Sequence, residues 1–106
     1  MDIFYEKKDK YLKFVINEEL DHHIVEKLRK KADYEIERHI PKKVIFDFQN
    51  VTFMDSAGIG LILGRYRNVS VLGGIVEIIN VNDNINKILT MSGITRLIKI
   101  KEKECA

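Results

Sequence analysis

The chain has 106 residues, of which 45% are hydrophobic and 32% are charged, with 18 basic and 16 acidic side chains. This length suffices for one domain whose core needs no disulfide or structural metal, and the composition is that of an ordinary soluble globular protein. The formal charge of +2 argues against nucleic acid or an anionic membrane as the main partner, because both usually need a concentrated basic surface.

Apolar runs and their periodicity predict strands that alternate with helices after an initial hairpin. The polar residues at 7–10 separate the first two runs and predict a turn near Asp9. In chain order we expect strands over Ile3–Glu6 and Tyr11–Ile16, a helix from about His22 to His39, a strand over Val44–Phe48, a helix over Gly58–Leu72, a strand over Ile75–Val81, a short helix after Asn82, and an edge strand over Leu97–Ile100.

Local signals mark where the helices begin and end. Asp21 is expected to cap the first helix, which Pro41 stops. In that helix, apolar residues recur at steps of four, as expected for a buried stripe. Glycines at 73–74 and Gly93 are stop signals for the next two helices, and Asn82 is a candidate cap for the last.

The order β-β-α-β-α-β-α-β predicts an α/β fold. Strands alternating with helices imply a largely parallel sheet with right-handed crossovers, to which the N-terminal hairpin is added. The run Val44–Phe48 is nearly all apolar, broken by Asp47, and is typical of a central strand covered on both faces. No internal repeat or linker divides the chain.

The compartment is expected to be the cytoplasm. The first residues have neither the basic start nor the apolar stretch of a secretory signal, and no apolar run approaches the ~20 residues of a membrane span. The single Cys105 cannot form an internal disulfide and is expected to be inert. The densest basic run, at 29–31, is flanked by acidic residues and is interpreted as a solvated helix face.

The most informative segment is Phe53–Gly60, which follows a predicted strand directly and opens a predicted helix. Loops beyond the carboxyl ends of strands are where open α/β sheets meet ligands and partners. Ser56 is expected at the N-cap or in the first turn, with its hydroxyl at the surface beside free backbone amides. On spacing alone, helix capping by Asp55 or Ser56, worth about 1 kcal/mol, is the simpler account.

Two details favour a role for this segment beyond helix capping. Gly58, Gly60 and Gly64 fall in the first turns of the helix, where each costs about 1 kcal/mol relative to alanine. That cost fits a backbone that lies close to another surface, either the sheet beneath or a protein above. Of the two large apolar residues in the loop, Phe53 is expected to pack, while Met54 could pack or form an apolar rim for a partner.

No enzymatic motif is complete. A serine hydrolase elbow needs glycine two residues before the nucleophile, where this chain has Met54. Leu63 stands at the third glycine of a dinucleotide fingerprint, and no phosphate-binding loop ending in Gly-Lys-Ser/Thr exists. His22 and His23 are adjacent at a helix start, so they are expected to point apart and not to share a metal ion. We therefore expect no catalysis, no cofactor and no metal site.

Residues 53–67, FMDSAGIGLILGRYR, resemble the signature of the anti-sigma-factor antagonists, the STAS-domain family. Within the family they most resemble the sporulation branch, which acts on the sigma-F anti-sigma kinase. Residues 19–23 (ELDHH) and 91–93 (MSG) agree with this resemblance, which extends over about residues 3–100. It implies a single STAS-type domain over residues 1–106, with a mixed sheet of four to five strands and helices packed mainly on one face.

The resemblance also implies a binding switch. In the family, an anti-sigma factor that is itself a serine kinase phosphorylates the serine that corresponds to Ser56. The unphosphorylated antagonist binds the kinase and releases the sigma factor, and a PP2C-type serine phosphatase restores it. The phosphate, with a charge of about −1.5 to −2 beside Asp55, is expected to spoil the interface with little conformational change. The implied partner-binding residues are Asp21, Met54, Asp55, Ser56, Ala57, Gly58 and Gly60, in a chain expected to be monomeric when free.

Other functions stay open. A stress-response antagonist would act on a different sigma factor, although residues 22–23 and 63–67 favour the sporulation type. A small phosphoryl carrier would need a labile phospho-residue, usually histidine, in an exposed loop, and we expect none of the three histidines to lie beside the glycine-rich helix. A nucleotide- or ligand-sensing STAS module lacks a recognisable phosphate loop.

Overall fold

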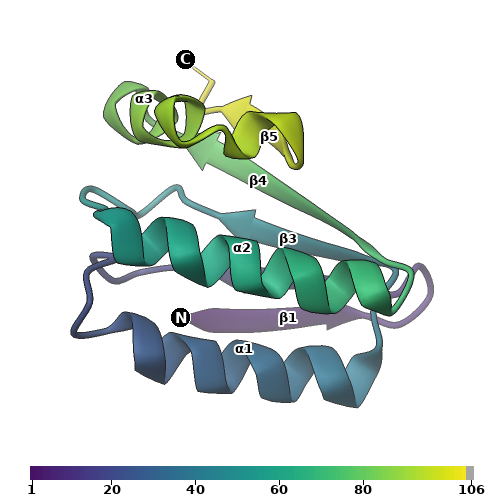
Figure 1. Ribbon diagram of the computed structural model, residues 1–106. Coiled ribbons are helices and arrows are strands. Elements are labelled where there is room, and N and C mark those ends of the chain that lie inside the picture. The colour runs from purple at the N-terminus through teal and green to yellow at the C-terminus, as the bar shows by residue number, and fades with distance from the viewer. Residues whose placement is uncertain (105–106) are drawn as a thin grey trace.

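The computed structural model describes residues 1–104, and the prediction that Cys105 is inert lies outside the described residues. The elements follow the predicted order, with one short 3-10 helix added (Figure 1). They are β1 (Asp2–Glu6), β2 (Tyr11–Val15), α1 (Val25–His39), β3 (Lys43–Asp47), α2 (Ser56–Val71), β4 (Ile75–Val81), α3 (Asp83–Ser92), η1 (Ile94–Arg96) and β5 (Lys99–Glu102).

The five strands form one mixed sheet in the spatial order β1-β2-β3-β4-β5. Strand β1 is antiparallel to β2, whereas β2, β3, β4 and β5 run parallel to one another. The predicted hairpin and largely parallel sheet are therefore confirmed. Because β2, β3 and β4 run in one direction, their carboxyl ends and the amino ends of α1 and α2 all lie on the left of Figure 1.

The helices cover one face of the sheet, and the core lies between them (Figure 1). Side chains alternate along the strands, so that Val44 and Phe46 of β3 are fully buried while Ile45 between them is partly exposed. The prediction that this strand is covered on both faces is wrong. Ile45 instead lies between Lys13 and Glu77 on the neighbouring strands, and the apolar stem of such a lysine can shield it.

Ion pairs line this open face of the sheet. Nζ of Lys43 lies 2.6 Å from a carboxylate oxygen of Glu77, and Nζ of Lys13 lies 3.5 Å from one of Asp47. Burial raises the pKa of Glu77, but the hydrogen bond and the charge of Lys43 outweigh it and leave the pKa lowered. These ion pairs explain how Asp47 and Glu77 can be buried on the face of the sheet opposite the helices.

Helix α1 begins later than predicted. Asp21 is expected to cap this helix, but the N-cap residue of α1 is Ile24, which makes no side-chain cap bond. Oδ1 of Asp21 instead accepts hydrogen bonds from the amides of His23 (2.9 Å) and Ile24 (3.2 Å), just before the helix. Those residues form a turn, however, and the regular helix begins at Val25. The predicted stop is confirmed: the chain turns at Ile40, whose φ of 45° is left-handed, directly before Pro41.

Helix α2 buries a broader face than its apolar pattern indicates. The sequence pattern predicts that Ile59, Ile62, Tyr66 and Val69 share one face. Ile62 and Val69 are buried, and Ile59 and Tyr66 are partly buried and packed against the core. The fully buried positions are Gly58, Leu61, Ile62, Arg65 and Val69. Arg65 is buried because Asp33 of α1 lies opposite, with Oδ1 2.8 Å from its Nε.

Two loops at the carboxyl ends of β2 and β3 are joined by a short stretch of parallel pairing. The amide of Leu20 donates to the carbonyl of Phe53 (3.0 Å), and the amide of Asp55 donates to that of Leu20 (3.1 Å). Leu20 and Met54 are both buried under this contact. Gly58 makes room for them, because a Cβ there would lie 2.7 Å from Sδ of Met54 and 3.1 Å from Cβ of Leu20.

The other two glycines of α2 behave differently. A Cβ at Gly60 or Gly64 would meet no atom of the described chain within 4 Å. Gly58 thus lies close to another part of the chain, as expected, although the contact is with the loops and not with the sheet. At Gly60 and Gly64 no such contact is found among residues 1–104, and the alternative of a protein above them stays a prediction.

The first prediction concerns Gly58. We expect Gly58→Ala to lower the free energy of unfolding by about 2 kcal/mol, because the buried Met54 must shift and the overpacking exceeds the gain in helix propensity. Gly64→Ala is the matched control and should stabilise by up to about 1 kcal/mol. Urea denaturation followed by circular dichroism measures both, and equal effects at the two glycines would contradict the packing described.

A second prediction concerns the pair of Arg65 and Asp33. Burial lowers the pKa of Arg65, and its Nη1 has no hydrogen-bond partner among residues 1–104. Its Nε lies close to Asp33 but is not aligned for a hydrogen bond. We expect Asp33→Ala to cost about 2 kcal/mol, since it leaves the buried guanidinium uncompensated, whereas Arg65→Met should be nearly neutral.

Urea denaturation of both variants and of the double variant tests this pairing. Adding Asp33→Ala to Arg65→Met should cost far less than it does in the unaltered chain. Additive effects would show that the charges act independently.

Candidate functional site

Ser56 is the first residue of α2 and is exposed. The preceding Asp55 is the cap: it has an extended backbone, and its Oδ1 accepts a hydrogen bond from the amide of Ala57 at 2.8 Å. The sequence left the cap open between these two residues, and the structure assigns it to Asp55. The hydroxyl of Ser56 is therefore left at the surface with no capping role.

The backbone amides near Ser56 are less available than expected. The amide of Ala57 is taken by the Asp55 side chain, and that of Gly58 donates to the Asp55 carbonyl at 3.0 Å. A group placed on the Ser56 oxygen would have to compete with Asp55 for these donors. The positive end of the α2 dipole still lies beneath it.

The structure brings the Asp21 segment beside Ser56. The pairing of Leu20 with Met54 places the next residues, Asp21 and His22, next to the start of α2. Nδ1 of His22 lies 4.0 Å from Oδ2 of Asp55, the cap of α2, so the expectation that no histidine lies beside the glycine-rich helix is wrong. Two regions separated by more than 30 residues in the sequence thus form one surface.

The expectation that His22 and His23 point apart is wrong. Their ring centroids are 3.9 Å apart. The two residues lie in the turn before α1, so the angular spacing of a helix does not apply to them. Within residues 1–104, no group of three or more histidine, cysteine, aspartate or glutamate side chains is placed to hold a metal ion.

The prediction for Phe53 is wrong, and the structure decides the position of Met54, which the sequence left open. Phe53, expected to pack, is 48% exposed, and Met54 is 3% exposed. Met54 points inward because the bridge to Leu20 sets the side on which each residue of the loop lies. The sequence analysis therefore missed Phe53 as an exposed residue of this surface. Gly58, four residues after Met54, was the signal in the sequence that could have indicated an inward-pointing Met54.

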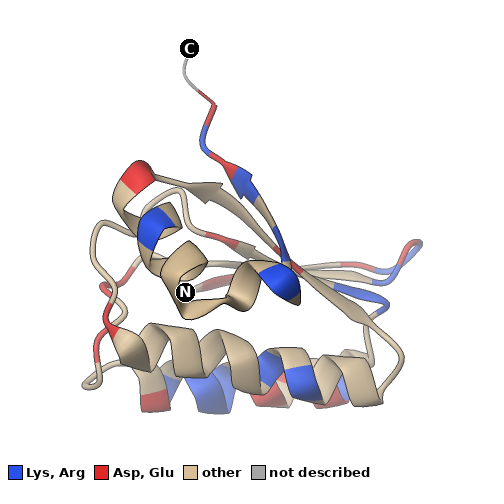
Figure 2. Ribbon diagram, turned by 45° about the horizontal axis from the view of Figure 1, so that its top comes forward, with Lys and Arg blue, Asp and Glu red and all other residues tan. Residues whose placement is uncertain are grey.

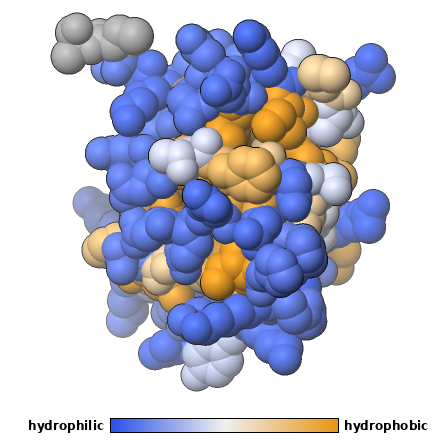
Figure 3. Space-filling model, turned by 90° about the vertical axis from the view of Figure 1, so that its left-hand side faces the viewer, coloured by the Kyte–Doolittle hydropathy of each residue, from blue (hydrophilic) through white to orange (hydrophobic). Residues whose placement is uncertain are grey.

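The predicted site residues therefore fall into two groups. Met54 and Gly58 are buried and form the frame under the loop, whereas Ser56 and Gly60 are exposed and Asp21, Asp55 and Ala57 are partly exposed. Figure 3 looks onto this end of the molecule and shows apolar surface in patches among hydrophilic side chains. Apolar surface rimmed by polar side chains is typical of surfaces that bind other proteins.

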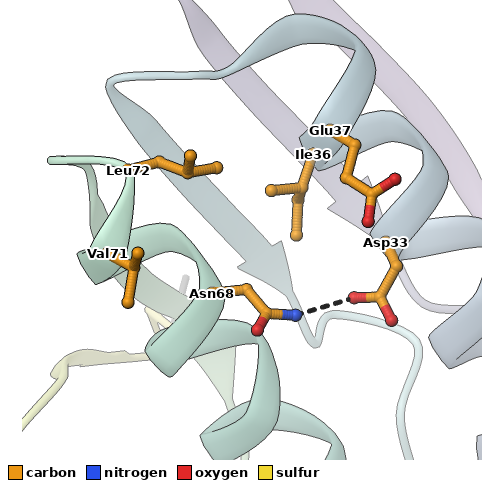
Figure 4. A pocket seen from close by; sticks show the side chains of 6 residues that line it. All are labelled: Asp33, Ile36, Glu37, Asn68, Val71 and Leu72. Carbon is orange, nitrogen blue, oxygen red and sulfur yellow. Dashed lines mark hydrogen bonds between the residues drawn. The ribbon is translucent and has the colours of Figure 1, made fainter.

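A hollow between α1 and α2 lies elsewhere. Figure 4 shows Asn68 of α2 donating to Asp33 of α1 at 3.1 Å, with Val71 and Leu72 on the α2 side. Val71 is the last residue of α2 and Ser56 the first, so the helix separates them by roughly 22 Å. This hollow is not part of the Ser56 surface.

No helix among residues 1–104 is long and apolar enough to cross a membrane.

Comparison with known proteins agrees with this geometry. The model of the STAS domain matches residues 3–105. The anti-sigma F factor antagonist of Paenibacillus polymyxa is 36% identical over 86 residues, which cover 81% of this chain and 74% of that protein.

Solved structures of the anti-sigma factor antagonist SpoIIAA are also similar. Its unphosphorylated form is 29% identical with a TM-score of 0.78, over 93% of this chain and 87% of that one. The phosphorylated form, from Bacillus, is 29% identical with a TM-score of 0.69, over 93% of this chain and 90% of that one. Since the family model spans nearly all of the sequence, this chain belongs to the STAS-domain family.

Proposed function

We propose that this protein is an anti-sigma factor antagonist of the sporulation sigma-F type, switched by phosphorylation of Ser56. Its unphosphorylated form binds an anti-sigma factor that is a serine kinase, and so releases the sigma factor. The observation that carries this proposal is the exposed Ser56 hydroxyl, which the Asp55 cap leaves free at the start of α2. The names of the similar proteins support the same role.

In the proposed reaction the chain is a substrate and not a catalyst. Oγ of Ser56 attacks the γ-phosphorus of ATP bound to the kinase; the new O–P bond forms, the bond to ADP breaks, and the hydroxyl proton passes to a base of the kinase. A PP2C-type serine phosphatase hydrolyses the ester and restores the hydroxyl. We propose the cytoplasm as the compartment of both steps.

The charge of the phosphate accounts for the loss of binding. A partner surface that is complementary to the Ser56 hydroxyl would instead meet a phosphate. This group carries a charge of about −1.5 to −2, next to the carboxylates of Asp55 and Asp21. The partner-binding residues that we propose at this surface are Asp21, Asp55, Ser56, Ala57 and Gly60, on the buried frame of Met54 and Gly58.

The fold need not change for the switch to work. Ser56 makes no capping bond that a phosphate would break, and the α2 dipole favours an anion at this end. In the relative SpoIIAA, the unphosphorylated and the phosphorylated forms both superimpose on 93% of this chain.

The test of this proposal is phosphorylation by the anti-sigma kinase of the same genome with ATP, followed by mass spectrometry. We expect a single phosphate on Ser56, absent from Ser56→Ala, which should still bind the unmodified kinase. Ser70→Ala, at an exposed serine of the same helix, is the matched control and should be phosphorylated normally. If a kinase that is active on another antagonist adds no phosphate here, the proposed switch is wrong.

A further prediction concerns the phosphorylated form. We expect its amide chemical shifts to change only around residues 20–24 and 53–60, with the free energy of unfolding altered by about 1 kcal/mol or less, because the phosphate sits at a solvated helix start. Two-dimensional NMR and urea denaturation measure the two quantities. Shift changes throughout α2, as in a refolded helix, would refute a switch that acts only on the interface.

A further inference from the structure

Three lysines of helix α1 form no ion pair with a carboxylate of residues 1–104. Lys27, Lys30 and Lys31 are exposed, and nowhere in residues 1–104 does a carboxylate lie within 4.0 Å of their ammonium groups. The other basic side chains of the helix are engaged: Arg29 contacts Glu26 and Asp33, and Arg38 and His39 both contact Glu35. Figure 2 shows the basic and acidic residues along α1.

An apolar hollow adjoins these lysines. It lies between β1 and α1, has a volume of about 270 Å³, and is lined by Ile3, Lys30, Lys31, Tyr34 and Glu35. Tyr34 is 63% exposed, so its ring forms an open wall of the hollow. Residues 27, 30, 31 and 34 lie on one side of α1, because positions three and four apart are neighbours on a helix.

The strand beside the hollow is the edge of the sheet. Among the described strands, β1 pairs only with β2, so no strand of residues 1–104 lies against its outer row of backbone N–H and C=O groups. An extended segment of another protein could add to this edge, as peptides do at other open sheets.

We propose that this surface, formed by Lys27, Lys30, Lys31, Tyr34 and Ile3, docks an extended acidic segment of a partner protein. An apolar side chain of the segment fills the hollow against Tyr34 and Ile3, and flanking carboxylates meet the lysines. The surface lies apart from the Ser56 loop, so the proposal is independent of the proposed function.

Charge decides between the possible occupants. A second copy of the chain that used the same surface would bring its own lysines against Lys27, Lys30 and Lys31, and like charges opposite each other are unfavourable. An anionic membrane is held by clusters of about four to eight basic residues, more than the described residues provide at this surface. A short acidic segment matches both the charge and the single hollow.

The experiment titrates the ¹⁵N-labelled chain with the peptide acetyl-GEEFEEG-amide at low ionic strength. We expect shift changes at Ile3, Lys30, Lys31 and Tyr34, and a dissociation constant that rises with salt. The peptides GKKFKKG, with reversed charge, and GEEGEEG, without the aromatic anchor, should bind more weakly by roughly tenfold or more.

Variants of the chain locate the contact. Replacing Lys27, Lys30 and Lys31 by glutamine should weaken binding by about tenfold, since each exposed charge contact contributes a factor of about two. Glutamine at Lys7, Lys8 and Lys10, three exposed lysines in the β1–β2 turn, changes the net charge equally and should leave the affinity within about twofold. Tyr34→Ala should weaken GEEFEEG but not GEEGEEG.

Three outcomes overturn the proposal. Equal losses of affinity in the two lysine variants would show that binding depends only on the net charge of the chain. Binding to vesicles containing 30% phosphatidylserine without binding of GEEFEEG would assign the surface to a membrane. Self-association of the free chain, with shifts in β1, would assign it to a second copy.

Discussion

The short pairing between Leu20 and Met54 is the contact on which the Ser56 surface depends. It extends the parallel pairing of β2 with β3 beyond the ends of both strands, so the two loops leave the sheet side by side. Neither loop could hold this position alone, because each lacks an internal ladder of hydrogen bonds. The buried side chains beneath the bridge and the missing Cβ of Gly58 allow α2 to start directly above it.

The position of the cap decides what Ser56 can do. A serine at the N-cap would use its oxygen to accept a bond from the helix amides, and phosphorylation would then break the cap. Because Asp55 provides the cap, the Ser56 oxygen carries no structural bond. Capping and a modifiable hydroxyl, which looked like alternatives in the sequence, are therefore divided between two adjacent residues.

The parts of the structure that local patterns control could be predicted from the sequence. The element order, the turn near Asp9 and the stop at Pro41 follow from periodicity and backbone chemistry within a few residues. The exposure of Phe53 and the burial of Arg65 could not be predicted, because both depend on residues far away in the sequence. The bridge to Leu20 determines which loop side chains point inward, and Asp33 compensates the charge of the buried Arg65 guanidinium. The open face of β3 was not predicted for the same reason. Lysine and carboxylate side chains of the neighbouring strands lie on this face, where the apolar sequence of β3 indicated a covering layer.

The same division between frame and surface separates stability from binding. Leu20, Met54 and Gly58 are buried, so changes there act on the packing of the loops and of α2 together. Ser56 and Gly60 are exposed and contact little of the chain, so changes there leave most of the folding free energy untouched. A charge added at Ser56 can thus alter what the surface binds while the sheet and helices beneath it keep their positions, which is the property that a reversible switch on a small domain requires.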